Sequence, residues 1–146
     1  MTRFVAHVPR VFLGLIFTVF GLVGLLHLMP DPPMPEGIAG TYLQALTGTY
    51  LFTLVKLTEV VGGALLLSNR FVAFGSVLLA PVVVNIFAAH ALVMHEGVGM
   101  PIALVAALAF TAWQQRAVFR PLFVAKPVSA PAPELTRSGG LSAAAP

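Results

Sequence analysis

The chain contains no cysteine and very little charge. Of its 146 residues, 58% are hydrophobic and only 9% are charged. Without cysteine it can form no disulfide, no thiolate metal site and no thiol-exchange centre. A soluble domain of this length could not hide so much apolar surface, because most of the surface of such a domain stays wet. With a mean hydropathy of +0.95, these absences predict a membrane protein of one domain.

Clusters of basic residues are also missing. The sequence pI of about 10.0 could suggest a protein that binds nucleic acid. However, the eight Lys and Arg residues are scattered along an apolar chain and belong to no RNA- or DNA-binding motif. We therefore expect no nucleic-acid partner. The partner that the composition predicts is the lipid bilayer.

Four apolar stretches have the length of a membrane-spanning helix. They cover residues 11–29, 50–67, 71–94 and about 98–113. Each is close to the roughly 20 residues that cross the hydrocarbon core, and the last is the shortest. Because lipid offers no partner to a free backbone group, all four should be α-helical. The first is too long for the apolar region of a signal peptide. The sequence thus predicts an all-α membrane protein, with a bundle of four transmembrane helices in residues 1–123.

Basic residues outside these stretches should all lie on one side of the membrane. They are Arg3, Arg10, Arg70, Arg116, Arg120, Lys126 and Arg137. The two remaining loops carry Asp31, Glu36 and Glu96 but no Lys or Arg. Since loops rich in Lys and Arg stay in the cytoplasm, we expect a multi-pass protein of the plasma or inner membrane with both termini cytoplasmic.

Two segments outside the spans have distinctive compositions. The prolines of residues 30–35 exclude helix there. After them, Ile38, Tyr42 and Leu46 recur at helical spacing, but Gly37 and Gly40 make a solvated loop as compatible as a short interfacial helix that would act as a lid. Residues 124–146 are rich in Pro, Ala, Ser and Gly and lack aromatic residues, which predicts a disordered cytoplasmic tail.

Polar residues within the spans define a candidate ligand pocket. Lys56 and Glu59 are the only formally charged residues well inside a span, where a charge costs at least about 2.5 kcal/mol. Three positions apart on one helix, they can form an ion pair. At a rise of 1.5 Å per residue, His27, Asn85 and His90 fall with them in the outer half of the membrane. Intramembrane polar groups nearly always face the bundle interior, so these five residues should converge.

Small residues accompany the ion pair. Gly62 and Gly63 follow it on the same helical face, and Gly21 and Gly24 form a similar face on the first helix. Such faces let helices approach closely. Pro81 predicts a kink just before Asn85. The glycines are equally compatible with plain helix packing, and a helix proline such as Pro81 is more often only a bend.

The residue types limit the chemistry of the pocket. His27 and His90 could be hydrogen-bond partners, proton carriers or metal ligands. Two histidines at similar depth permit haem ligation without requiring it, and we do not expect haem. A zinc or di-iron site would need more ligands, such as a Glu-x-x-His motif, which is absent, so we predict no metal. Phe17, Phe20 and Phe87 could supply apolar walls for a quinone-like or other amphipathic ligand.

Three segments carry a family resemblance over roughly residues 10–123. They are RVFLGLIFTVFGLVGLLHLMPDPPMP, VKLTEVVGGALLLSNRF and LLAPVVVNIFAAHA. With these segments the chain resembles the DoxX family of small four-helix membrane proteins. The resemblance implies a four-helix membrane protein with cytoplasmic termini. The residues that match polar positions of the family are His27, Lys56, Glu59, Asn85 and His90.

The resemblance implies a redox context without a single activity. Some members of that family are membrane subunits of a thiosulfate:quinone oxidoreductase, and others associate with enzymes of superoxide and thiol stress. In this interpretation, Lys56 or His27 would hydrogen-bond a ligand oxygen, and Glu59 would set the charge of Lys56 or relay a proton. Asn85 and His90 would orient the head group. Because the chain lacks cysteine and a soluble redox domain, sulfur chemistry would require a redox partner subunit.

A second interpretation is a non-catalytic scaffold or partner-docking protein. In that case the cluster of Lys, Glu, His and Asn side chains would only hold the helices together. A homo-oligomer is compatible with both interpretations. A proton-coupled transporter is less well supported, because the sequence shows no inverted repeat and the cytoplasmic half of the bundle is apolar.

Overall fold

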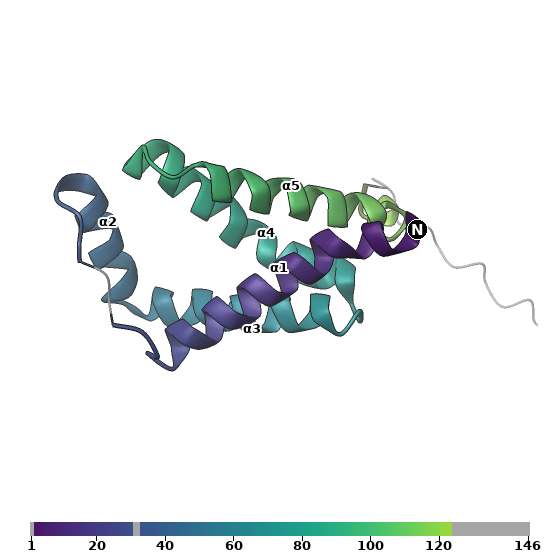
Figure 1. Cartoon of the computed structure of the whole chain (residues 1–146), viewed down its shortest axis with the longest axis horizontal. Coiled ribbons are helices and arrows are strands. Elements are labelled where there is room, and N and C mark those ends of the chain that lie inside the picture. Colours follow the sequence, from purple (N-terminus) through teal and green to yellow (C-terminus); the bar gives the residue numbers. More distant parts are fainter. Residues whose placement is uncertain (1, 31–32, 124–146) are drawn as a thin grey trace, which may run out of the picture.

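The structure is a computed structural model that describes residues 2–30 and 33–123. All regular secondary structure in this part of the chain is helical. Four long helices lie side by side and a shorter helix lies across one end of them (Figure 1). The long helices are α1 (Thr2–Leu25), α3 (Tyr50–Leu67), α4 (Val72–Ala88) and α5 (Gly99–Gln114), and the short one is α2 (Gly37–Thr47). The remaining elements are a π-helix, η1 (Ala89–Met94), a short α6 (Arg116–Phe119) and a 3₁₀ turn, η2 (Arg120–Phe123).

Three helical segments of the described chain are long and apolar enough to cross a membrane. They are His7–Leu25, Tyr50–Leu67 and Val72–Met94. The 16 residues of α5 are too few on their own, but α5 with Arg116–Phe123 would form a fourth span that is bent by 73°. Residues 2–30 and 33–123 are therefore all-helical, with three candidate membrane spans, or up to four. This agrees with the predicted membrane protein.

Two predicted spans differ from the structure, one in where it ends and one in its helical winding. The first was expected to continue to residue 29, whereas α1 ends at Leu25. His27 takes a left-handed conformation with φ 50°, the N–H of Leu28 donates to the carbonyl of Val23, and that of His27 donates to Gly24. This is a Schellman ending, which usually has glycine at the position of His27. The third predicted span is also not one regular helix, because its last six residues form η1.

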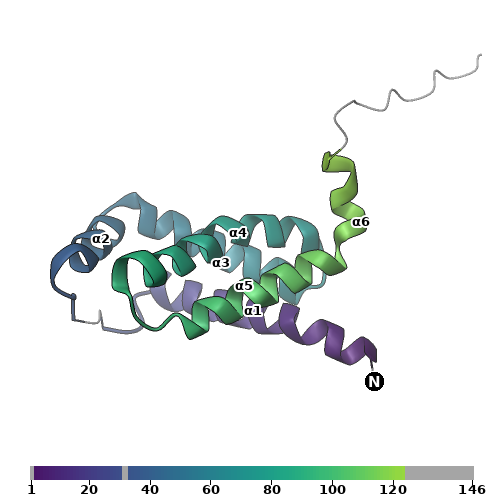
Figure 2. The same ribbon diagram turned by 90° about the horizontal axis from the view of Figure 1, so that it is seen from above.

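The four long helices pack in a ring. Helix α1 contacts α3 and α5, and α4 contacts the same two helices from the opposite side (Figure 2). The buried side chains between them come from α1, α3, α4 and α5, and they are Leu13, Phe17, Leu66, Leu79, Val82, Val83, Leu104 and Leu108. Lipid is as apolar as this core, so the helices gain little from hiding apolar surface and are held by close packing.

Glycines set the closest approach between α1 and α3, as their spacing predicted. A Cβ on Gly63 would lie 2.7 Å from the backbone nitrogen of Thr18 and 2.9 Å from the carbonyl oxygen of Gly14. A Cβ on Gly21 would lie 3.0 Å from the backbone nitrogen of Val60. These contacts are with backbone atoms, which cannot move aside as a flexible side chain can. Larger residues would therefore push the two helices apart.

The segment after the prolines, for which the sequence left a loop or a helix open, forms helix α2. It contacts α3 and η1, and the hydroxyl oxygen of Tyr42 accepts a hydrogen bond of 2.8 Å from Nδ2 of Asn85 on α4. Its length and its place across the helix ends suit the predicted lid. Residues 31 and 32 of the connector, and the predicted tail at 124–146, lie outside the described residues.

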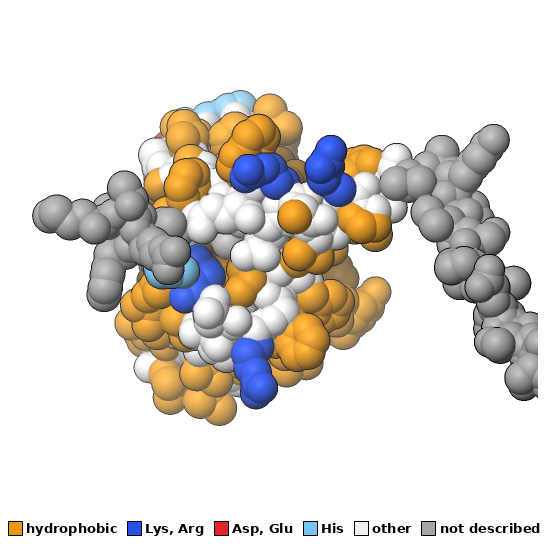
Figure 3. Space-filling view, turned by 90° about the vertical axis from the view of Figure 1, so that its right-hand side faces the viewer, with side chains coloured by type: hydrophobic (Ala, Val, Ile, Leu, Met, Phe, Trp, Pro, Cys, Tyr) orange, Lys and Arg blue, Asp and Glu red, His pale blue; other side chains and the backbone are white. Residues whose placement is uncertain are grey.

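The two ends of the molecule carry opposite charge. Figure 3 views the end at which the chain starts, where Lys and Arg side chains are grouped. This basic end comprises Arg10 on α1, Arg70 in the turn between α3 and α4, Arg116 on α6 and Arg120 on η2. Nη1 of Arg10 donates to Oδ1 of Asn69 and so ties α1 to that turn. The opposite, acidic end has Glu36 before α2 and Glu96 after η1.

Candidate functional site

A cavity of about 260 Å³ lies among the long helices, toward the acidic end. It contains three of the five predicted site residues, Lys56, Glu59 and His90, together with the predicted apolar walls Phe17 and Phe20. We call it the polar cavity. Its remaining lining is apolar and comes from α1, α4 and α5, and it consists of Ile16, Ile86, Met100, Pro101 and Leu104.

The predicted ion pair is present in this cavity. Nζ of Lys56 lies 2.8 Å from Oε2 of Glu59, and the side chains are 18% and 5% exposed. The ammonium also lies 5.7 Å from the centroid of the Phe52 ring, in a cation–π arrangement. A Cβ on Gly24 would lie 2.8 Å from both Cδ and Cε of Lys56. The glycine on α1 therefore makes the space through which the lysine stem passes.

His90 enters the cavity from the π-helix η1. Its Nδ1 lies 2.9 Å from the carbonyl oxygen of Ile86. A carbonyl can only accept, so Nδ1 carries the hydrogen and Nε2 is left as an acceptor in the neutral ring. π-helical turns are rare and often occur at functional sites. Nothing in the sequence indicates this π-helix, because the segment AHALVM contains no helix-breaking residue.

A second and larger cavity, of about 670 Å³, opens at the acidic end. We call it the end cavity. Its walls are the start of α2, the end of η1 and the loop that follows, and they comprise Pro35, Glu36, Ile38, Ala39, His90, Val93, Met94, His95, Glu96 and Gly97. His90 lines both cavities. The sequence did not single out this cavity, because its walls come from two segments that are far apart in the chain.

Two predicted site residues do not line the polar cavity. His27 is exposed in the turn after α1, with its ring centroid 6.4 Å from that of Phe52. Asn85 is exposed and faces α2, where Tyr42 is its partner. Phe87, expected as an apolar wall, is 39% exposed and does not line the cavity either. The apolar residues of α5 were missed, because an apolar helix offers no chemical signal in the sequence.

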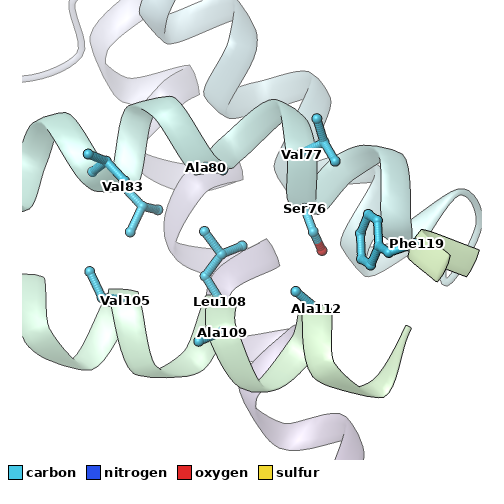
Figure 4. Close-up of a pocket in the computed structure, with 10 residues that line it drawn as sticks. Ser76, Val77, Ala80, Val83, Val105, Leu108, Ala109, Ala112 and Phe119 are labelled. Carbon is cyan, nitrogen blue, oxygen red and sulfur yellow. The ribbon is translucent and has the colours of Figure 1, made fainter. Parts of the chain in front are cut away.

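A third cavity, of about 270 Å³, lies between α4 and α5 nearer the basic end (Figure 4). Its walls are almost wholly apolar, with side chains such as Val83, Val105, Leu108 and Phe119. The one hydroxyl, of Ser76, donates to the carbonyl of Val72 at 2.9 Å and is thereby satisfied. This cavity therefore offers no group for catalysis or for polar recognition.

Comparison of the chain with models of protein families, with curated proteins and with solved structures gave no match. The resemblance to the DoxX family therefore stays a prediction. Among the residues that the structure describes, no group of three or more His, Cys, Asp and Glu side chains could hold a metal ion. What the polar cavity does offer is a cationic donor, a carboxylate and an imidazole nitrogen on apolar walls. Such a site can hydrogen-bond the oxygen atoms of an otherwise apolar molecule.

Proposed function

We propose that this chain is a DoxX-like membrane subunit, associated with redox or stress enzymes, that binds a quinone-like or other amphipathic molecule in the polar cavity. The observation that carries the proposal is the buried Lys56–Glu59 pair, which shares an apolar cavity with His90. A charge at membrane depth is expensive and commonly marks a functional site. If its only role were to hold helices together, the pair would need no cavity beside it.

The position of the cavity suits a ligand that arrives through the membrane. Phe20 on α1 and Met100 on α5 are 50% and 53% exposed, so the cavity reaches the surface between these two helices. Its volume of about 260 Å³ is below the roughly 300 to 1,000 Å³ of sites that enclose a whole drug-sized ligand. We infer that it holds a head group while an apolar tail stays in the lipid.

Within this proposal each polar group has a role. Lys56 donates to a ligand oxygen, Glu59 balances the charge of Lys56, and Nε2 of His90 accepts from a ligand hydroxyl or takes part in proton exchange. A quinone neither gains nor loses electrons without a second redox centre, which a partner subunit would supply. His27 and Asn85 have no direct role, because neither lines the cavity.

We further propose four membrane spans with both termini in the cytoplasm. The separation of the basic end from the acidic end supports this orientation, because Lys and Arg near a membrane favour the cytoplasmic side. The polar cavity then lies in the outer half of the membrane, in a plasma or inner membrane.

The decisive experiment identifies what the purified protein retains. The full chain is purified in mild detergent, and the bound small molecules are extracted and measured by mass spectrometry. The wild-type protein should retain a quinone or a similar amphipath, and the double variant Lys56→Met with Glu59→Leu should fold but lose it. Asn85→Leu is the matched control, because it removes a polar side chain of α4 outside the cavity and should retain the ligand.

One outcome would favour the scaffold interpretation instead. If the double variant folds and retains every small molecule that the wild-type protein retains, the ion pair has no part in binding. The cluster would then be structural only.

A further inference from the structure

His90 stands between the two cavities at the acidic end. It lines the polar cavity with Lys56 and Glu59, and it also lines the end cavity with Glu36, His95 and others. Of the residues that the structure describes, it is the only one that lines both of these cavities. The end cavity has the exposed side chains of Glu36, His95 and Glu96 in its walls, whereas Glu59 in the polar cavity is only 4% exposed. The imidazole of His90 therefore borders both a space lined by exposed ionisable side chains and the space that holds the buried ion pair.

The hydrogen bonding of His90 leaves one nitrogen for exchange. Nδ1 is held by the carbonyl of Ile86 at 2.9 Å, which fixes the ring and directs any proton exchange to Nε2. On the side of the end cavity, Gly97 presents no side chain to the ring. A Cβ there would lie 3.6 Å from Cδ2 of His90, the carbon bonded to Nε2. Gly97 therefore places no side chain beside this edge of the ring, where any larger residue would contact it.

Among the residues that the structure describes, the ionisable side chains that line these cavities with His90 fall into two groups. Lys56 and Glu59 of α3 share the polar cavity, and Glu36, His95 and Glu96 share the end cavity. The residues that α1 and α5 contribute to the polar cavity are apolar. Among the described residues, His90 is thus the titratable group placed to pass a proton between the acidic end and the buried pair.

We propose that His90 is the proton-transfer residue of the polar cavity and connects a ligand oxygen there to the end cavity. This inference rests on the proposed function. Nε2 takes a proton from water in the end cavity and forms an imidazolium. The Nε2–H bond then breaks as an O–H bond forms on an anionic ligand oxygen in the polar cavity, which returns His90 to its neutral form. No electron is transferred in this step, and the reverse sequence releases the proton.

The test uses a probe whose ionisation is visible. An alkylated 2-hydroxy-1,4-naphthoquinone changes colour when its hydroxyl loses a proton. The full-length protein is placed in lipid nanodiscs, so that the opening between α1 and α5 faces acyl chains. A stopped-flow pH jump then gives the rate at which the bound probe changes colour. His90→Ala should slow this rate by about 100-fold, the scale on which a positioned acid–base group acts.

Two further measurements separate proton transfer from a structural role. Added imidazole should restore a large part of the rate in His90→Ala, because it can occupy the vacated space, whereas a merely structural role predicts no rescue. His27→Ala is the matched control. His27 is exposed and lines neither cavity, so its removal should leave the rate unchanged. If His90→Ala no longer holds the probe, the rate is measured on His90→Gln, which keeps a hydrogen-bonding side chain but does not titrate.

The possible results distinguish this inference from the function on which it rests. If the probe binds and the His90 variant that retains it exchanges as fast as the wild-type protein, the proton-transfer role is refuted and the binding site stands. Slow exchange that imidazole does not restore in His90→Ala also refutes it. If the wild-type protein does not bind the probe in competition with the amphipath that co-purifies with it, the proposed function fails together with this inference.

Discussion

Lys56 and Glu59 are not equally buried, and this predicts unequal costs for their removal. The side chain of Glu59 is 5% exposed and that of Lys56 is 18% exposed, with the Phe52 ring beside the Lys56 ammonium group. Loss of either partner from a buried pair costs about 3 to 5 kcal/mol. The cost of Lys56→Met should lie at the upper end of this range, because this substitution leaves the more deeply buried Glu59 carboxylate without a partner. Glu59→Leu should cost less, since the lysine retains Phe52 and some access to the surface.

Unfolding in detergent by heat or denaturant measures these costs. The double variant Lys56→Met with Glu59→Leu should lose far less stability than either single variant, because no uncompensated charge remains. Thr53→Val on the exposed face of α3 is the control, and it should change stability by less than about 0.5 kcal/mol. Costs of the single variants that simply add up in the double variant would contradict energetic pairing.

Which site residues could be predicted from the sequence depended on where their helices end. Lys56 and Glu59 lie in the middle of a span, so their direction followed from the cost of exposing charge to lipid. His27 could not be placed this way, because α1 ends at Leu25 and His27 itself takes the left-handed conformation that glycine usually takes there. Asn85 is paired with Tyr42, which is 43 positions earlier in the chain, and no local pattern indicates such a contact.

At the scale of the elements, the contact between α1 and α3 is the tightest feature. Gly63→Ala would bring a Cβ to 2.7 Å from the backbone nitrogen of Thr18. Because the backbone cannot move aside, we expect a loss of about 1 to 3 kcal/mol in the free energy of unfolding. Gly99→Ala at the start of α5 is the matched control, since its Cβ would meet nothing within 4 Å and should leave stability unchanged or slightly improved. Equal effects at both positions would show that the helices are less closely packed than described.

Helix α2 depends on one hydrogen bond to α4 besides its packing. Tyr42→Phe removes the bond to Asn85 with little change of shape and should cost about 0.5 to 1.5 kcal/mol. The loss should be local, so hydrogen exchange measured by mass spectrometry should accelerate in residues 37–47 but not in α3. Thr41→Val, which removes a bond from the exposed Thr41 hydroxyl to the carbonyl of Gly37 within α2, is the control. Unchanged exchange in α2 of Tyr42→Phe would mean that packing alone holds the helix.

The helices could be predicted from the sequence where their ends carry common sequence signals, such as a capping residue. The second predicted span coincides with α3 at Tyr50–Leu67, where the hydroxyl of Thr49 accepts from the N–H of Leu51 and caps the helix. The π-helical winding of η1 has no such signal. Helix α2 was uncertain because Gly37 and Gly40 weaken helix propensity, and its contacts with α3, η1 and Asn85 provide the missing stabilisation.

At the scale of the whole molecule, the proposed orientation can be tested without disturbing its charges. The chain has no cysteine, so Ser68→Cys and Thr47→Cys each introduce a single thiol in place of an exposed hydroxyl. Ser68 lies at the end of α3 near Arg70, and Thr47 lies on α2 at the acidic end. A membrane-impermeant maleimide applied to intact cells should label Thr47→Cys only, whereas both should react after permeabilisation. Labelling of Ser68→Cys in intact cells would reverse the orientation and place the polar cavity in the cytoplasmic half.

The bend after α5 makes the straight part of this helix shorter than the neighbouring candidate span. The 16 residues of α5 rise only about 24 Å, less than the hydrocarbon core of about 30 Å. The neighbouring segment Val72–Met94 has 23 residues, enough for the full thickness. With α5 as a span, this side of the protein has the shortest hydrophobic length, since the 18 residues of α3 rise about 27 Å, and the bilayer would thin most beside α5. Such hydrophobic mismatch draws proteins toward thinner membranes and favours contacts between short sides. The face of α5 is therefore where short-chain lipids, or the short side of a second copy, would gather.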